Sequence, residues 1–181
     1  MLQQQTAPPE AVGVLDGLTA DALPDWTREP VLLGCHGGAG TTTLRALLDS
    51  PWDLGAFAAE RKRIGTYGRP LVLVTRNTSA ASAQTGPVLG VLEANGIRPA
   101  ALVVVADGAG PEPAEAAARF RLAEERVLRT VRFPFVAGLR FVDTADVGRV
   151  RLPRRAQRAL EEITAACRDH AAHLFLNAGD D

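Results

Sequence analysis

The chain has 181 residues, of which 46% are hydrophobic, and a formal net charge of −1. This length suits a single domain with a sizeable core, and a charge near zero disfavours indiscriminate binding to nucleic acid. The longest apolar run, residues 100–106, is far shorter than the ~20 residues that cross a bilayer, and no secretion signal opens the chain, so we expect a cytoplasmic protein without a membrane span.

Composition divides the chain into a leader, a domain and a tail, at residues 1–30, 31–176 and 177–181. The leader is rich in Gln, Pro and Asp without sustained periodicity, which predicts a flexible acidic segment with one short helix near residues 12–18. The tail is expected to be disordered. Cys35 and Cys167 are far apart in the sequence, so we expect two buried thiols rather than a disulfide or a metal cluster.

Apolar runs alternate with helical periodicity along the domain. Continuous, largely apolar runs are typical of strands covered on both faces, and they occur at residues 31–35, 71–75 and 101–106; a fourth strand is predicted at residues 127–133. Helices are predicted at residues 42–49, 79–95 and 113–125, and from Pro153 onward. A kink or second start is expected at Gly86-Pro87, and residues 52–69 are expected to be irregular. This order predicts an α/β fold with a doubly wound, mostly parallel sheet flanked by helices.

One stretch, Gly-Cys-His-Gly-Gly-Ala-Gly-Thr-Thr-Thr-Leu at residues 34–44, joins the first predicted strand to the first predicted helix. Glycines permit the positive φ angles that turn backbone N–H groups inward, so such a loop can cradle a phosphate without any charged side chain. The full phosphate-binding loop has the pattern G-x-x-x-x-G-K-[ST]. Gly40 fills the second glycine position and Thr42 the hydroxyl position, whereas Thr41 replaces the lysine; Gly34 stands one residue before the first glycine position, which Cys35 occupies.

Residues 36–43 resemble the K-G-G-x-G-K-T-T loop of ParA/MinD-like P-loop ATPases, with His36 and Thr41 in place of the two lysines. Weaker similarity follows in Leu-Val-Leu-Val-Thr-Arg-Asn-Thr-Ser, Ala-Leu-Val-Val-Val-Ala-Asp and Val-Arg-Phe-Pro, which occur in the family's order. The chain is also similar to shortened ParA-like proteins of high-GC bacteria that are often encoded beside conjugation or mobile-element genes. The resemblance implies a P-loop NTPase-like fold with ATP and magnesium as ligands, whereas no cofactor follows from the residues alone.

The resemblance also predicts a function. The family's magnesium-binding aspartate and water-positioning acid have no counterpart in residues 52–69, and one catalytic cation can contribute ~10³-fold to phosphoryl transfer, so we expect no efficient enzyme. We expect a non-hydrolysing ParA/MinD-like pseudo-NTPase that acts as a binding or scaffold module with a protein partner, in DNA transfer or in plasmid or mobile-element maintenance. An alternative is a weak ATP- or GTP-hydrolysing homodimer that takes a cation from its partner subunit. The predicted phosphate- or nucleotide-binding residues are His36, Gly37, Gly38, Ala39, Gly40, Thr41, Thr42, Thr43 and Asp107.

Several of these residues have a second explanation. The glycine loop could be a strand-to-helix turn that has lost nucleotide binding, and Thr42, the predicted metal ligand, could instead cap a helix. Asp107 follows a buried strand, where α/β proteins place ligand groups, but Asp-Gly is also typical of a turn. His36 is the only side chain of the loop that could partly replace a cation. Arg76, at another strand end, is the nearest candidate for a replacement cation.

Arginines are concentrated in the second half of the chain. Residues 119–158 carry eleven arginines against four acids, while residues 1–30 carry five acids against one arginine. Arg154, Arg155 and Arg158 fall in the first turns of the last predicted helix, where each positive charge opposes the helix dipole by ~0.3–1 kcal/mol. We predict an arginine patch for an acidic partner, a DNA backbone or the chain's own leader, with a solvated helix face as the alternative. The arginine patch consists of Arg149, Arg151, Arg154, Arg155 and Arg158.

Overall fold

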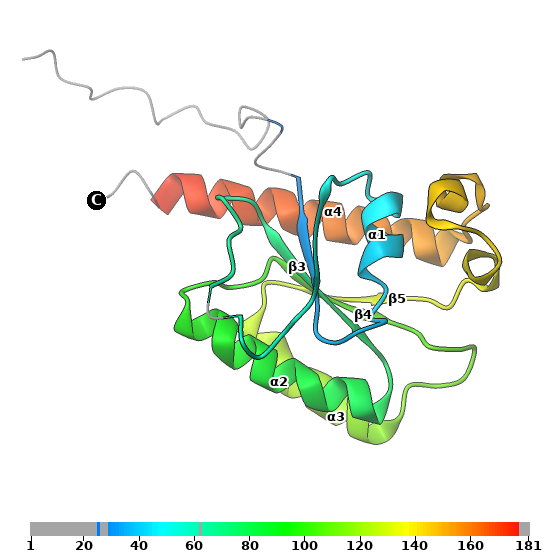
Figure 1. Cartoon of the computed structure of the whole chain (residues 1–181), viewed down its shortest axis with the longest axis horizontal. Helices are drawn as coiled ribbons and strands as arrows, with labels where there is room; N and C mark the ends of the chain where they lie inside the picture. The colour runs from blue at the N-terminus through cyan, green and yellow to red at the C-terminus, as the bar shows by residue number, and fades with distance from the viewer. Residues whose placement is uncertain (1–24, 26–28, 62, 178–181) are drawn as a thin grey trace, which may run out of the picture.

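The computed structural model describes residue 25 and residues 29–61 and 63–177 (Figure 1). Most of the predicted leader, including the helix expected near residues 12–18, lies outside the described residues, as do residues 178–181 of the predicted tail. Within the described residues, five parallel strands form one sheet in the order β2-β1-β3-β4-β5. The strands are β1 (Val31–Gly34), β2 (Trp52–Ala56), β3 (Leu71–Arg76), β4 (Ala101–Val105) and β5 (Thr130–Phe133).

Helices cover both faces of the sheet (Figure 1). One face carries α1 (Thr41–Leu47) and α4 (Arg154–Asn177), and the other carries α2 (Ser79–Ala94) and α3 (Ala114–Ala123). Short 3-10 helices follow α3 and β5, namely η3 (Glu124–Arg126), η4 (Ala137–Arg140) and η5 (Thr144–Arg149). This architecture confirms the predicted α/β class, with an all-parallel rather than mostly parallel sheet, and it is compatible with a doubly wound fold.

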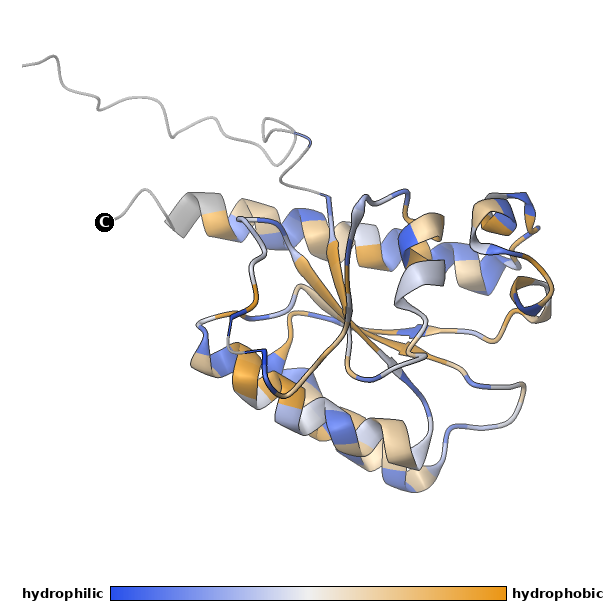
Figure 2. Cartoon of the chain, in the orientation of Figure 1, coloured by the Kyte–Doolittle hydropathy of each residue, from blue (hydrophilic) through white to orange (hydrophobic). Residues whose placement is uncertain are grey.

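The strands divide their side chains between two cores because successive residues of a strand point to opposite faces of a sheet. In β3, Val72 and Val74 pack into the core beneath α1 and α4, whereas Leu71 and Leu73 pack into the core beneath α2 and α3. Figure 2 shows mostly hydrophobic strands between helices that carry both hydrophobic and hydrophilic residues. Burial on both faces explains why continuous apolar runs correctly predicted the central strands.

The prediction that residues 52–69 are irregular is wrong for their first part, because Trp52–Ala56 forms the edge strand β2. This strand is only partly buried, and it contains Asp53 and a glycine, Gly55, with a φ of 71°. Its sequence therefore lacks the apolar run that a central strand shows. Backbone pairing with β1, from Val31 onward, places it in the sheet.

Other element boundaries also differ from the predictions. α2 is one continuous helix through Pro87, which excludes the second start that was expected as the alternative to a kink, and both Gly86 and Pro87 are exposed. The carbonyl that loses its partner at Pro87 belongs to Ala83, which is exposed, so water can satisfy it. β5 begins at Thr130 rather than at residue 127. None of the described helices combines the length and apolar character that a bilayer span requires.

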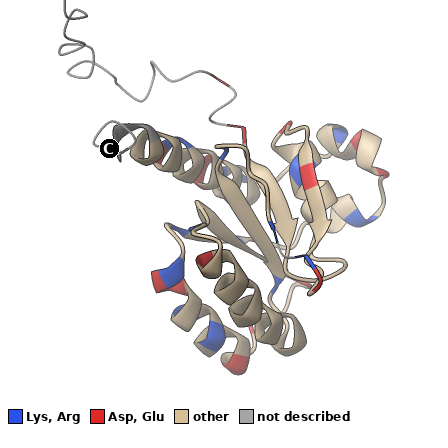
Figure 3. Ribbon diagram, turned by 60° about the vertical axis from the view of Figure 1, so that its left-hand side comes forward, with Lys and Arg blue, Asp and Glu red and all other residues tan. Residues whose placement is uncertain are grey.

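α4 packs along β3, β4 and β5 through an apolar stripe. Ala156, Ile163, Cys167 and Ala171 are buried, as the helical spacing predicts, whereas Leu174 is 43% exposed and lies outside the stripe. Figure 3 shows that charged residues lie mainly on helices and loops rather than on the strands.

His170 of α4 makes the stability of the fold depend on pH. Burial, followed by the charges of His173 and Arg98, lowers the pKa of His170 below the usual value for histidine. The unfolded chain therefore takes up this proton at a higher pH than the folded chain does, so stability should fall as the pH drops below about 6.5. Urea unfolding midpoints from about pH 8 down to about pH 5 measure this effect. His170→Gln should flatten the pH dependence, and an unchanged slope would contradict the assignment.

The two cysteines are buried, as predicted. Burial raises the pKa of each thiol to about 12, and at Cys35 hydrogen bonds with Thr85 and Thr75 oppose this effect only in part. Because the thiolate is the reactive form, neither thiol should react with iodoacetamide at about pH 8 in the folded protein, and both should react in urea. Mass spectrometry of the alkylated protein measures this. Rapid alkylation of the folded chain would contradict the burial of Cys35 or Cys167.

Candidate functional site

The loop between β1 and α1 is a compact turn at the carboxyl edge of the sheet. Gly38 and Gly40 have φ angles of 75° and 104°, which glycine adopts without strain. A Cβ atom added at Gly34 would lie 3.1 Å from the carbonyl oxygen of His36 and 3.2 Å from the Cβ of Ala39. The loop therefore folds closely over the end of β1, and three of its glycines are needed for that shape.

The backbone amides of the loop and of the first turn of α1 have no partner in the part of the chain that the structure describes. Residues 36–43 donate no backbone hydrogen bond there, and the next amide, that of Leu44, donates to the carbonyl oxygen of Gly40 at 3.0 Å. Unpaired amides beside buried residues such as Ala39 and Thr41 cost free energy unless water or another acceptor meets them. The amides of the loop are thus left to water or to another acceptor.

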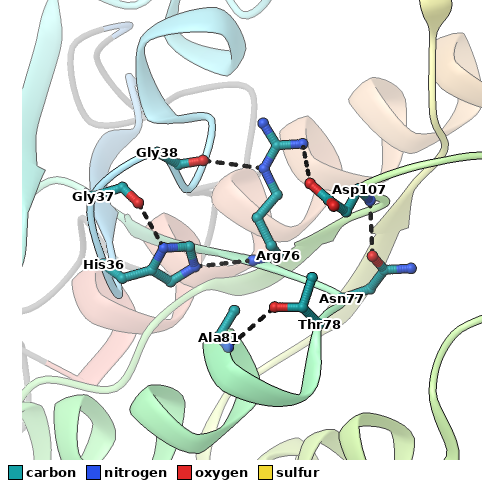
Figure 4. A network of polar contacts seen from close by, with 8 residues as sticks. All are labelled: His36, Gly37, Gly38, Arg76, Asn77, Thr78, Ala81 and Asp107. Atoms are coloured by element: carbon teal, nitrogen blue, oxygen red, sulfur yellow. Dashed lines mark hydrogen bonds and ion pairs between the residues drawn. The ribbon is translucent and has the colours of Figure 1, made fainter.

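The side chain of His36 points toward β3 (Figure 4). Its Nε2 lies 3.3 Å from the backbone N of Arg76, and its Nδ1 lies 2.8 Å from the carbonyl oxygen of Gly37. These two contacts fit the tautomer that carries its proton on Nδ1, which then donates to Gly37 while Nε2 accepts from Arg76. His36 therefore joins the loop to β3 and has no ring nitrogen left for a ligand.

Arg76, the last residue of β3, extends its side chain over the loop (Figure 4). Its Nε donates to the carbonyl oxygen of Gly38 at 3.1 Å, and one terminal nitrogen lies 3.6 Å from a carboxylate oxygen of Asp107. The backbone N of Asp107 in turn donates to the side-chain oxygen of Asn77 at 2.8 Å. Asp107 is thus held beside Arg76, and the second terminal nitrogen of Arg76 makes no contact with the residues drawn.

A cavity of about 100 Å³ opens beside the loop, and two arginines line it. Arg76 reaches it from β3 and Arg140 from η4, next to Gly40 and Thr43. The guanidinium of Arg140 lies 5.3 Å from the centre of the Phe135 ring, a contact that restrains it. The remaining walls are apolar and come from Leu44, Val105, Phe133, Val136 and Leu139. No local pattern indicated Arg140, since only the fold of η4 brings it to this cavity.

A hydroxyl and a carboxylate meet on the other side of α1. The Oγ1 of Thr42 donates to a carboxylate oxygen of Asp53 at 3.2 Å, and the other oxygen of Asp53 accepts from the backbone N of Gly55 at 2.8 Å. Asp53 was not among the predicted site residues, because the strand that carries it, β2, was not predicted. Among the described residues, no group of three or more His, Cys, Asp or Glu side chains could hold a metal ion. Two protein oxygens suit magnesium only together with a phosphate and water molecules.

The arginine patch is divided in the structure. Arg149 forms an ion pair with Asp146 at 2.7 Å, whereas Arg155 and Arg158 line a second cavity, of about 400 Å³. Arg151 and Arg154 are exposed and line neither cavity. The patch is therefore not one continuous set of equivalent cations.

The fold and the site together define a class of protein. It is an α/β protein with an all-parallel sheet, in which a glycine-rich loop, an arginine and an aspartate meet at the carboxyl ends of β1, β3 and β4. Ligands of open α/β sheets bind at this edge, at the point between neighbouring strands whose connections leave to opposite faces, here β1 and β3. No protein-family model matches the chain, and neither a curated protein nor a solved structure matches it.

Proposed function

We propose that the protein binds a phosphorylated ligand on the loop of residues 36–43 and does not hydrolyse it efficiently. The position of Arg76 is the observation that carries this proposal. Its guanidinium is tied to the carbonyl oxygen of Gly38 and to Asp107, and one of its terminal nitrogens stays available beside the unpaired amides. Since a guanidinium is always charged, Arg76 supplies the fixed cation that the loop lacks in place of a lysine.

The cavity beside the loop supports a small anionic group as the part of the ligand that is enclosed. Its volume of about 100 Å³ is well below the about 300–1,000 Å³ typical of pockets that enclose a whole small-molecule ligand. A phosphoryl group fits such a space between Arg76 and Arg140, whereas a nucleoside would lie outside it. Charge-assisted hydrogen bonds from two arginines are the strong kind for phosphate recognition.

The absence of efficient hydrolysis is proposed because, among the described residues, each titratable side chain beside the loop already has a partner within the chain. His36 engages both ring nitrogens within the chain, and Asp107 is paired with Arg76. The loop also has Thr41 where the lysine that faces the transferring phosphoryl group is expected. The site can hold a phosphate firmly without accelerating its transfer.

A finer assignment follows from the resemblance of residues 36–43 to ParA/MinD-like proteins. We assign the chain to the doubly wound, P-loop NTPase-like class, as a degenerate member that acts as a scaffold with a protein partner in DNA transfer or mobile-element maintenance. Thr42 and Asp53 would hold magnesium, which neutralises charge on a bound nucleotide's phosphates. A weak ATPase that is active only as a dimer is the competing assignment.

Titration of the purified protein with pyrophosphate or ATP, with and without magnesium, tests the proposal. A ligand at a hundred times its Kd adds ~2.7 kcal/mol of stability, which raises the Tm of a chain of this size by about 5–10 °C. Phosphate release from ATP should stay at the level of buffer alone. Turnover that requires magnesium and rises more steeply than protein concentration would favour the dimeric ATPase. An unchanged Tm with all ligands would refute phosphate binding.

A further inference from the structure

The second cavity lies between the start of α4 and the carboxyl ends of β4 and β5. We call it the arginine groove, and its main lining residues are Asn77, Arg132, Phe133, Pro134, Arg155 and Arg158. Its volume of about 400 Å³ lies within the range typical of binding sites, about 300–1,000 Å³. Phe133 and Pro134 also line the smaller cavity beside the loop, so the two cavities share a wall.

Two arginines of the groove have no acidic partner in the described part of the chain. Arg155 and Arg158 lie about one helical turn apart on α4 and form no ion pair there. Arg132 is engaged by Glu112, through two contacts of 3.2 Å. Glu162 is the remaining acid of the groove, and no ion pair joins it to Arg158. Arg155 and Arg158 are therefore the cations that the groove offers to an incoming acid.

Folding alone does not favour these two arginines at their positions. A cation in the first turns of a helix opposes the helix dipole, at a cost of ~0.3–1 kcal/mol each. Arg155 and Arg158 stand in the first turns of α4 and face a groove with an apolar floor rather than open solvent alone. An occupant with carboxylates and apolar side chains would satisfy both features of the groove.

The chain itself contains such a segment in residues 10–24, outside the described structure. Its acids are Glu10, Asp16 and Asp21, and its apolar residues are Ala11, Val12, Val14, Leu15, Leu18, Ala20, Ala22 and Leu23. When fully extended, the ten residues from Asp21 to Val31 span at most about 33 Å, which exceeds the straight-line separation between the start of β1 and the far corner of the sheet. Counted from the start of β1, the carboxyl end of β5 lies about 14 Å away across the sheet, which is three strand spacings, and about 13 Å away along the strands, which is four residues.

We propose that residues 10–24 dock in the arginine groove of the same chain, with Asp16 and Asp21 against Arg155 and Arg158. The apolar side chains of this segment then cover Ala106 and Pro134, the half-buried apolar residues of the groove. A nucleic acid fits the groove less well, because Phe133 is buried and offers no face for base stacking. Docking there places the segment beside the wall that the groove shares with the phosphate cavity.

Hydrogen–deuterium exchange of the full chain, read by mass spectrometry, tests this docking. Amides of residues 12–23 should exchange at least about tenfold more slowly than in a free synthetic peptide of the same sequence. Arg155→Glu with Arg158→Glu should abolish the protection. Arg151→Glu with Arg154→Glu is the matched control, since it makes the same charge change outside the groove, and it should leave the protection in place. Unchanged exchange of the five strands verifies that each variant is folded.

Charge exchange makes the test specific for the pairing. Asp16→Lys with Asp21→Lys should abolish the protection, and combination with Arg155→Glu and Arg158→Glu should restore it. Exchange of residues 12–23 at the free-peptide rate in the unaltered chain would overturn the proposal. Protection that is lost on dilution would also overturn it, because the segment would then dock on a second copy of the chain. Protection that the control variant removes equally would overturn it as well, because the segment would then dock on another surface. Tighter binding of single-stranded DNA than of the leader peptide to the groove, abolished by the same arginine variants, would overturn it in favour of a nucleic acid.

Discussion

Replacement of Arg76 by glutamine is expected to weaken pyrophosphate binding about 10- to 100-fold, because a hydrogen bond to a charged group contributes about 1.5–3 kcal/mol. Arg76 is tied to Gly38 and Asp107, so its guanidinium is oriented before the ligand arrives. Glutamine keeps a polar side chain of similar reach but has no charge. Isothermal titration calorimetry of both proteins, at one fixed ionic strength, measures the loss.

Two further variants identify the cause of that loss. Arg121→Gln removes an exposed arginine of α3, far from the loop in the sequence, and should leave the affinity within about twofold. Arg140→Gln should weaken binding as Arg76→Gln does, since both arginines line the same cavity. Equal affinity of Arg76→Gln and the unaltered protein would mean that the amides alone hold the anion, or that the anion binds elsewhere.

The central strands could be predicted because consecutive residues along each of them are buried and mostly apolar. Every residue from Leu71 to Thr75 is buried, so β3 appears in the sequence as an unbroken, largely apolar run. β2 carries no comparable signal, since it is an edge strand and its outer positions are exposed. Its place depends on hydrogen bonds with β1, which a local pattern does not contain.

The candidate site divides in the same way. The turn at Gly38 and Gly40 could be predicted because positive φ angles favour glycine, and glycine is visible in the sequence. Arg76 was found as a strand-end cation, but its contact with Gly38 depends on how β3 lies beside β1. Asp53 lies in the segment that was expected to be irregular, and Arg140 reaches the site from η4, for which no local pattern was identified. His36 was expected to act toward a ligand, whereas the structure turns it toward the backbone of β3.

The core beneath α2 and α3 provides the largest expected effect on stability. Phe120 of α3 is fully buried among the side chains of β1, β3, β4 and α2. Phe120→Ala should lower the free energy of unfolding by about 3–5 kcal/mol, since it removes the apolar contacts and leaves a cavity that the surrounding strands cannot close. Such a loss is a large fraction of the about 5–15 kcal/mol by which domains are stable. Urea denaturation followed by circular dichroism measures it.

The neighbouring exposed face of α3 supplies the matched comparison. Leu122 lies two residues further along the same helix and is 79% exposed, so Leu122→Ala should change the free energy of unfolding by no more than about 0.5 kcal/mol. The two variants remove side chains of similar type from one helix, and they differ in which face they occupy. A loss at Leu122 equal to that at Phe120 would mean that α3 presents a different face to the sheet. Because α3 leads into β5, and β5 carries Phe133 of the shared cavity wall, that result would also displace the carboxyl edge on which the proposed phosphate site depends.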